Sequence, residues 1–143
     1  MTTLERATFR NHFHACAFVT GPDEERALLE PFFVEGLRAG ARAVYIVDPG
    51  KRDEHDAWLA HAAPPGGAFE VTTWNDAHLK GGSFDKDRMS AALDDMIRDN
   101  AAAGRPPMRL VGQMGWVFSN PPGIDQLVEY EATVNEVLNR GKT

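Results

Sequence analysis

Residues 17–48, which read AFVTGPDEERALLEPFFVEGLRAGARAVYIVD, decide the fold. A short apolar run ends at Gly21, and a helical pattern follows from residue 23 to residue 39. The next segment, RAVYIV at residues 42–47, is a β-branched run of strand length and is typical of a strand buried on both faces. A strand, a helix and a second strand in this order indicate an α/β fold.

The rest of the chain repeats this alternation. The predicted strands span residues 13–20, 42–47, 68–74 and 108–118, and the predicted helices span residues 23–39, 53–63, 87–103 and 124–139. Pro31 cannot donate the helical hydrogen bond, so we expect a kink or a short turn before the main part of the first helix. We expect one α/β domain over residues 1–143, with helices flanking a mostly parallel sheet and residues 1–11 as a flexible N-terminal segment.

The composition excludes several classes of protein. The chain has 143 residues, of which 43% are hydrophobic and 25% charged, as in an ordinary globular domain. Its formal net charge of −6 disfavours direct binding to DNA or RNA, whose phosphates attract basic surfaces. No run approaches the roughly 18 apolar residues of a membrane helix, and the first residues lack the apolar core of a secretory signal. With a single cysteine, these features predict a cytoplasmic protein that contacts neither nucleic acid nor membrane.

Gly21 takes the place of the first glycine of a phosphate-binding P-loop. That loop has the pattern G-x-x-x-x-G-K-[ST], in which backbone amides and the lysine hold phosphates and the hydroxyl holds magnesium. Here the second glycine, the lysine and the hydroxyl residue are replaced by Arg26, Ala27 and Leu28. The acidic residues 23–25 would also repel a triphosphate. The sequence therefore predicts a degenerate P-loop and argues against an ATPase.

Five segments together resemble those of a known family. They are HFHAC at residues 12–16, PFFVEGLRAGARAVYIVD at 31–48, GSFDKDRM at 82–89, RLVGQMGW at 109–116 and LVEYEATVNEVL at 127–138. The opening of the chain resembles that of RecA/KaiC-type ATPase domains. The whole set resembles the MEDS family, a bacterial and archaeal sensory domain proposed to detect small hydrocarbon derivatives. The resemblance implies a RecA/KaiC-like sheet and a sensing function.

Members of that family are usually attached to output modules, such as DNA-binding domains or histidine-kinase-type ATPase domains. Once the four strand–helix units are assigned, no residues remain here for a helix-turn-helix. We therefore expect the output, in signalling or transcriptional regulation, to pass to a partner chain such as a kinase or a regulator. A homodimer stays open.

Glu131 interrupts the apolar stripe of the last predicted helix. The stripe consists of Ile124, Leu127, Val128, Val134 and Leu138. An unpaired carboxylate is costly to bury, so we expect Glu131 to pair with Arg109 or a histidine, or to bind a polar group of a ligand. The structural alternatives are a buried ion pair and a carboxylate at the edge of the apolar face. The resemblance, in which the YE pair is characteristic, adds weight to a role in binding.

His12, His14 and Cys16 alternate, so they share one face of the first predicted strand. Imidazole and thiolate suit zinc, copper or haem iron, although the sequence offers no fourth ligand. In a central strand the cysteine can instead be a small apolar core residue. The resemblance implies only His14 and Cys16 as pocket residues, and no cofactor is assigned.

The fourth predicted strand offers a pocket wall near its carboxyl end, where parallel sheets bind ligands. Alternation places Gly112, Met114 and Trp116 on one face, and Gln113 and Gly115 on the other. Glycines in a strand often mark the close approach of a ligand or of another backbone segment. Trp116 would supply apolar surface and Gln113 an orienting polar group. The alternative is that Trp116 and Met114 are core residues under a crossing helix.

The remaining polar residues are interpreted as structural. Asp48 either binds a ligand or caps a turn, and Ser83 and Asp85 cap the third helix. We expect three histidines, His55, His61 and His78, on the solvated surface. No nucleophile has an oriented base beside it, so we expect no enzymatic activity.

We therefore expect a small-molecule sensory domain. The candidate ligand-binding residues are His14, Cys16, Gln113, Trp116 and Glu131. They are expected in a cleft between the ends of the first and fourth strands and the last helix, with the loop 75–85 changing its arrangement on binding. Two alternatives stay open, a ligand-free protein-interaction module and a metal or haem sensor that uses His14 and Cys16.

Overall fold

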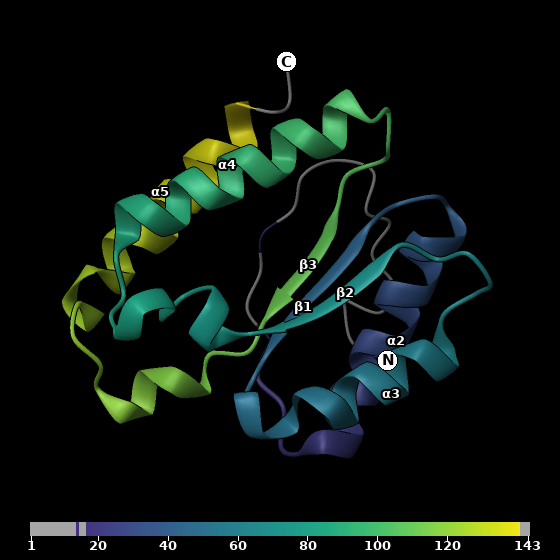
Figure 1. Ribbon diagram of the computed structural model, residues 1–143, viewed down its shortest axis with the longest axis horizontal. Helices are drawn as coiled ribbons and strands as arrows, with labels where there is room; N and C mark the ends of the chain where they lie inside the picture. Colours follow the sequence, from purple (N-terminus) through teal and green to yellow (C-terminus); the bar gives the residue numbers. More distant parts are fainter. Residues whose placement is uncertain (1–13, 15–16, 141–143) are drawn as a thin grey trace.

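The computed structural model describes residue 14 and residues 17–140 (Figure 1). The N-terminal segment 1–11, which we expect to be flexible, lies outside the described residues. His12 and Cys16 lie outside them as well.

Three parallel strands form the sheet, and this confirms the predicted α/β class. They are β1 (Ala43–Val47), β2 (Phe69–Thr73) and β3 (Arg109–Gly112), in the order β2-β1-β3. In the register, Tyr45 of β1 lies opposite Val71 of β2 and Val111 of β3. All five residues of β1 are buried, as the run of β-branched residues predicts for a central strand.

Two pairs of helices cover the two faces of the sheet (Figure 1). One face carries α2 (Pro22–Arg38) and α3 (Arg52–Ala62), and the other carries α4 (Lys86–Ala102) and α5 (Leu127–Arg140). Short 3-10 turns lie between them, η1 (Pro49–Lys51), η2 (Trp74–Asp76), η3 (Lys80–Gly82), η4 (Gly115–Ser119) and η5 (Ile124–Gln126). Within the described part of the chain, no helix is both long and apolar enough to cross a membrane.

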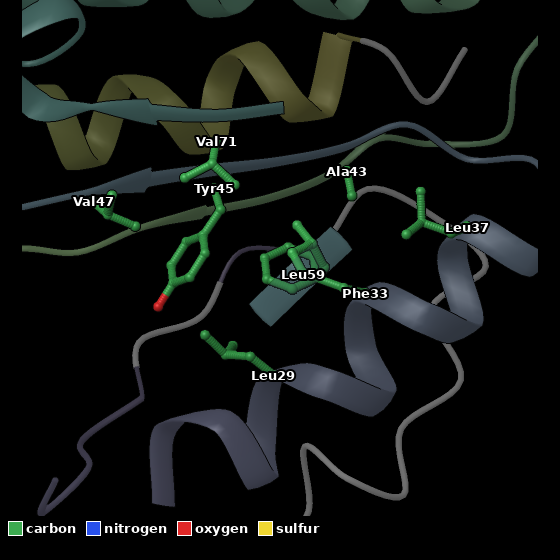
Figure 2. Packing of buried hydrophobic residues seen from close by; sticks show 8 residues of the cluster. All are labelled: Leu29, Phe33, Leu37, Ala43, Tyr45, Val47, Leu59 and Val71. Carbon is green, nitrogen blue, oxygen red and sulfur yellow. The ribbon is translucent and has the colours of Figure 1, made fainter. Parts of the chain in front are cut away.

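The core under α2 and α3 is a compact apolar cluster, shown in Figure 2. Its buried members are Leu29, Phe33, Leu37, Ala43, Tyr45, Val47, Leu59 and Val71. The ring of Tyr45 packs against that of Phe33 at a centroid distance of 5.3 Å, and its hydroxyl points away from Phe33 and Leu59 (Figure 2). This hydroxyl therefore reaches the edge of the core, where β1 ends.

The predicted strand at residues 13–20 is wrong for its described residues, His14 and 17–20, none of which is in a strand. The backbone N–H of Thr20 donates to Oε2 of Glu24, 3.3 Å away, rather than to a neighbouring strand. Phe18 is 94% exposed, so the apolar run gains little of the burial that would hold it in a sheet.

The first helix is also more continuous than predicted. α2 continues through Pro31 as one helix, so the separate short turn does not occur. Pro31 is exposed, and burial of Leu29, Phe33 and Leu37 at about 1.5–3 kcal/mol each outweighs the roughly 3 kcal/mol penalty of a helical proline.

The last strand is also shorter than predicted, because β3 ends at Gly112 and the chain turns into η4 at Gly115. The alternation of faces stops with the strand. Trp116 is therefore 1% exposed while Phe118, which strict alternation would place on the same face, is 92% exposed.

Candidate ligand-binding site

Four rings gather on the α4/α5 face of the sheet, next to the carboxyl ends of β2 and β3. Trp116 stacks between His78 and Phe84, at 5.3 Å and 28° from the first and 5.3 Å and 29° from the second. Tyr130 of α5 meets Phe84 edge-on at 5.3 Å and His78 at 6.4 Å. We call His78, Phe84, Trp116 and Tyr130 the Trp116 cluster.

The segment 75–85, which carries His78 and Phe84, is tied to α4 by a single side chain. The guanidinium of Arg88 donates to the carbonyl oxygens of His78, Lys80 and Ser83, at 3.0, 2.6 and 2.7 Å. Asp85 caps α4, as predicted, by accepting from the backbone N–H groups of residues 87 and 88 at 3.0 Å. The segment is therefore joined to α4 by the side chains of Arg88 and Asp85 rather than by strand pairing.

His78 is buried, with 6% of its surface exposed, so the prediction of a solvated residue is wrong. The reason lies in Gly112, where an added Cβ would stand 3.2 Å from Cε1 of His78. The strand has no side chain at this point, and the imidazole fills the space. The group that approaches this glycine is therefore the side chain of His78, and not the ligand or backbone that we expect from the sequence.

Two nitrogen atoms of the cluster are buried without a partner. Nδ1 of His78 and Nε1 of Trp116 have no hydrogen-bond partner among the described residues. Burial lowers the pKa of His78 to about 4, so its ring is neutral at pH 7. An unsatisfied buried polar group costs about 1–3 kcal/mol, so this pair is an expensive feature of an otherwise apolar core.

Tyr130 connects the cluster to the predicted residue Glu131. Burial is the larger cause and the charge of Glu131 the smaller one, and together they raise the pKa of Tyr130 to about 12. Glu131 itself turns outward, where its Oε2 lies 3.1 Å from Nε2 of His14. Nδ1 of the same imidazole lies 3.0 Å from Oδ1 of Asn135. The structure therefore joins two predicted site residues, His14 and Glu131, on the surface of α5.

The expected partner of Glu131 is thus the histidine and not Arg109. Arg109 lies on the other face, donating to the carbonyl oxygen of Phe32 at 2.8 Å and lying 3.7 Å from Glu35. The side chain of Glu131 is 38% exposed, which places it at the edge of the apolar face rather than within it. Val128, predicted in the same stripe, is 82% exposed.

Gln113 belongs to a third set of contacts, on the α2/α3 face. Its Oε1 accepts from the backbone N–H of Asp48 at 2.9 Å, and its Nε2 donates to Oε1 of Glu25 at 2.9 Å and to the hydroxyl of Tyr45 at 3.2 Å. Tyr45 also donates to Glu25, and burial and this carboxylate raise the pKa of the phenol. His55 completes this Gln113 network. The predicted pocket residues Gln113 and Trp116 therefore have separate surroundings, in the two layers on either side of the sheet.

Of the remaining predictions, some are confirmed and one is wrong. His55 is buried rather than solvated, because its ring packs edge-on against Tyr45 at 5.1 Å, while His61 is exposed as predicted. Asp48 caps a turn by accepting from the N–H of Gly50 at 2.9 Å. Among the residues that the structure describes, no group of three or more His, Cys, Asp and Glu side chains could hold a metal ion.

The fold is that of an α/β domain whose parallel sheet is covered on both faces by helices, with buried aromatic and polar groups beyond the ends of its strands. The family model MEDS, described as MEthanogen/methylotroph, DcmR Sensory domain, matches residues 13–143, so the chain belongs to this family of sensory domains. Searches of curated proteins and of solved structures found no match.

Proposed function

We propose that this sensory domain binds a small molecule at the Trp116 cluster and passes the signal to a partner protein. Family membership supports a sensing role. The observation that carries the choice of site is the pair of buried, unpartnered nitrogens on two stacked rings, Nδ1 of His78 and Nε1 of Trp116. A ligand that satisfies both would remove an unfavourable feature of this core.

The chemistry of the cluster favours a simple hydrocarbon derivative with a hydroxyl group. The indole N–H of Trp116 can only donate, and a neutral imidazole has one nitrogen that accepts and one that donates. A hydroxyl accepts one hydrogen bond and donates another, so it can pair with both rings. The apolar side chains around the cluster suit a short apolar body. We propose binding without catalysis, because the sequence shows no convincing pattern of a nucleophile with its base.

The signal would travel through the elements that carry the rings. His78 and Phe84 lie in the segment 75–85, and Tyr130 lies on α5. A ligand that prefers one arrangement of these elements shifts the population towards it. η4, which holds Trp116, and α5 also expose Phe118 and Val128, at 92% and 82%. We propose that a kinase or a regulator of transcription reads these exposed apolar side chains, in the cytoplasm, either from one chain or from a homodimer.

Calorimetric titration with 1-propanol tests the site. Trp116→Phe keeps an aromatic ring and removes the N–H, so we expect at least a tenfold loss of affinity, the equivalent of about 1.4 kcal/mol for one buried hydrogen bond. The matched control is Trp58→Phe, which alters an indole packed against the other core. Circular dichroism and thermal melting check that both variants fold. Equal affinity in the wild type and in Trp116→Phe would refute this site.

A further inference from the structure

All four rings of the Trp116 cluster are closed to solvent. His78 and Tyr130 are 6% exposed, and Phe84 and Trp116 are 1% exposed. Two of these rings, His78 and Phe84, stack against the indole of Trp116, and both come from the segment 75–85. A small molecule can therefore reach the indole N–H only after part of the protein has moved, and this segment carries the rings that cover it.

The backbone of the segment 75–85 is bonded mostly to itself. The segment forms the short turns between the end of β2 and the start of α4 (Figure 1). The backbone N–H groups of residues 77, 79, 80 and 82 donate to carbonyl oxygens of residues 74–79, at 2.7 to 3.3 Å. Among the described residues, the first of its backbone N–H groups to bond outside residues 74–85 is that of Phe84, which donates to the carbonyl oxygen of Pro122 at 2.8 Å.

Arg88 of α4 supplies the connection that the backbone of residues 75–83 lacks. Its guanidinium donates to the carbonyl oxygens of His78, Lys80 and Ser83, at 3.0, 2.6 and 2.7 Å. Its Nε is buried without a partner in the described part of the chain, so every hydrogen bond that this side chain makes there goes to the segment. Hydrogen bonds from a charged donor are roughly twice as strong as those between neutral groups. The position of residues 78–83 therefore depends on this one side chain and on packing.

Two glycines give the segment a place to bend. Gly81 and Gly82 have φ of 79° and 87°, a region that favours glycine, and a Cβ added at either would meet no atom within 4 Å. The chain can therefore change direction there without a steric obstacle. Phe84 follows the glycines and is anchored through its N–H, whereas His78 precedes them and its carbonyl oxygen is bonded to Arg88.

Given the proposed function of the Trp116 cluster, on which this inference rests, we propose that the segment 75–85 is a lid over it. Arg88 is the positioning residue that holds this lid closed. Breaking the bonds to Arg88 lets residues 75–83 turn at the glycines. This movement withdraws His78 from Trp116 and exposes the indole N–H, while Phe84 stays anchored. Arg88 then sets how often the cluster opens to a ligand.

Hydrogen exchange of the full chain, without ligand, tests the lid. Nitrogen-15 NMR follows the indole N–H of Trp116 and the backbone amides of β1 as urea is raised below the unfolding transition. After correction for intrinsic rates, the Trp116 N–H should exchange at least about tenfold faster than the β1 amides, and its rate should be nearly independent of urea, because a local opening exposes little surface. An exchange rate of Trp116 that equals that of β1 and rises with urea in the same way would overturn the proposal.

Two variants of α4 test the role of Arg88. Arg88→Met keeps an unbranched side chain and removes the guanidinium, so exchange of the Trp116 N–H should accelerate at least about tenfold more than exchange of the β1 amides. Arg98→Met removes an exposed arginine that pairs with Asp94 on the same helix, and it should leave the Trp116 rate unchanged. Equal acceleration of Trp116 and β1 in Arg88→Met would mean that Arg88 only stabilises the fold, and would overturn its role, as would an unchanged Trp116 rate.

Arg88→Lys gives the same comparison if Arg88→Met does not fold. It keeps the charge but replaces the planar fork by a single ammonium group, so we expect a smaller acceleration in the same direction. Because these measurements need no ligand, they separate the lid from the proposed function. A chain that shows this exchange pattern but does not bind 1-propanol would contradict the proposed function and support the lid.

Discussion

The two sides of the sheet differ in how their central buried polar side chains are bonded. In the part of the chain that the structure describes, each side also keeps unpartnered nitrogens, which on the α2/α3 side are Nδ1 of His55 and Nε of Arg26. On the α2/α3 side, Gln113 joins three elements through bonds to Asp48, Glu25 and Tyr45. On the α4/α5 side, the rings of His78 and Trp116 stack, and Nδ1 of the first and Nε1 of the second have no hydrogen-bond partner among the described residues. The first arrangement holds parts of the fold together. In the second arrangement, the packing of the rings must outweigh the free-energy cost of the two unsatisfied nitrogens. A ligand that bonds to these nitrogens would remove that cost, so the Trp116 cluster is the better place for a ligand to bind.

The largest expected effect is a loss of folding stability in acid, caused by the buried His78 of the Trp116 cluster. His78 has a pKa of about 4 in the folded state against an ordinary value of 6.5, so the unfolded chain binds its proton first as the pH falls. The free energy of unfolding should therefore drop by about 3 kcal/mol between pH 7 and pH 4, and level off below. Urea unfolding across this range measures the loss. His78→Phe should remove most of it, and an unchanged slope in this variant would show that other groups cause the loss.

The next largest effect on stability is expected from a substitution at Gly123, whose backbone lies against Phe84 of the Trp116 cluster. Gly123 has φ of 86°, and a Cβ there would lie 1.9 Å from the carbonyl oxygen of Phe84. Gly66 has a similar φ of 78° with open space around it, so it is the matched control. We expect Gly66→Ala to cost about 1 kcal/mol and Gly123→Ala about 2 kcal/mol more, because the second must also displace Phe84. Urea unfolding of both variants measures this difference, and equal losses would contradict it.

The Gln113 network gives the smallest expected effect. Gln113→Met keeps the shape and leaves the N–H of Asp48 and the carboxylate of Glu25 without their amide partner, at a cost of about 1.5 kcal/mol. Gln126 accepts only a hydrogen bond from the N–H of Lys86 among the contacts described, so Gln126→Met should cost less. Thermal unfolding of the two variants compares them. A larger loss at Gln126 would mean that the Gln113 network contributes less to stability than its bonds suggest.

The sequence predicts the layers well and the polar sites poorly. Apolar periodicity locates β1, α3, α4 and α5 because burial of whole faces determines those elements. The strand expected at residues 13–20 fails in its described part, since Thr20 bonds to Glu24 instead of to a strand. The local sequence pattern does not show which partner the backbone N–H of Thr20 will have.

Histidine burial shows the same limit. His78 is enclosed because Gly112, 34 positions later, leaves room for its ring, and His55 is enclosed because of Tyr45. Neither contact is visible in the neighbouring residues of the sequence. The glycines near the end of β3 indicated the close approach of a ligand or of backbone, whereas the group that approaches Gly112 is the side chain of His78.

The most direct test of the central claim is the indole N–H signal of Trp116 in a nitrogen-15 correlation spectrum of the full chain. On addition of 1-propanol, we predict a saturable shift of this signal, with no such shift for propane, which has the same carbon chain without the hydroxyl. The indole signals of Trp58 serve as the reference on the other side of the sheet. Equal responses to 1-propanol and propane, or no response of Trp116, would contradict the claim that its unpartnered nitrogen marks the sensing site.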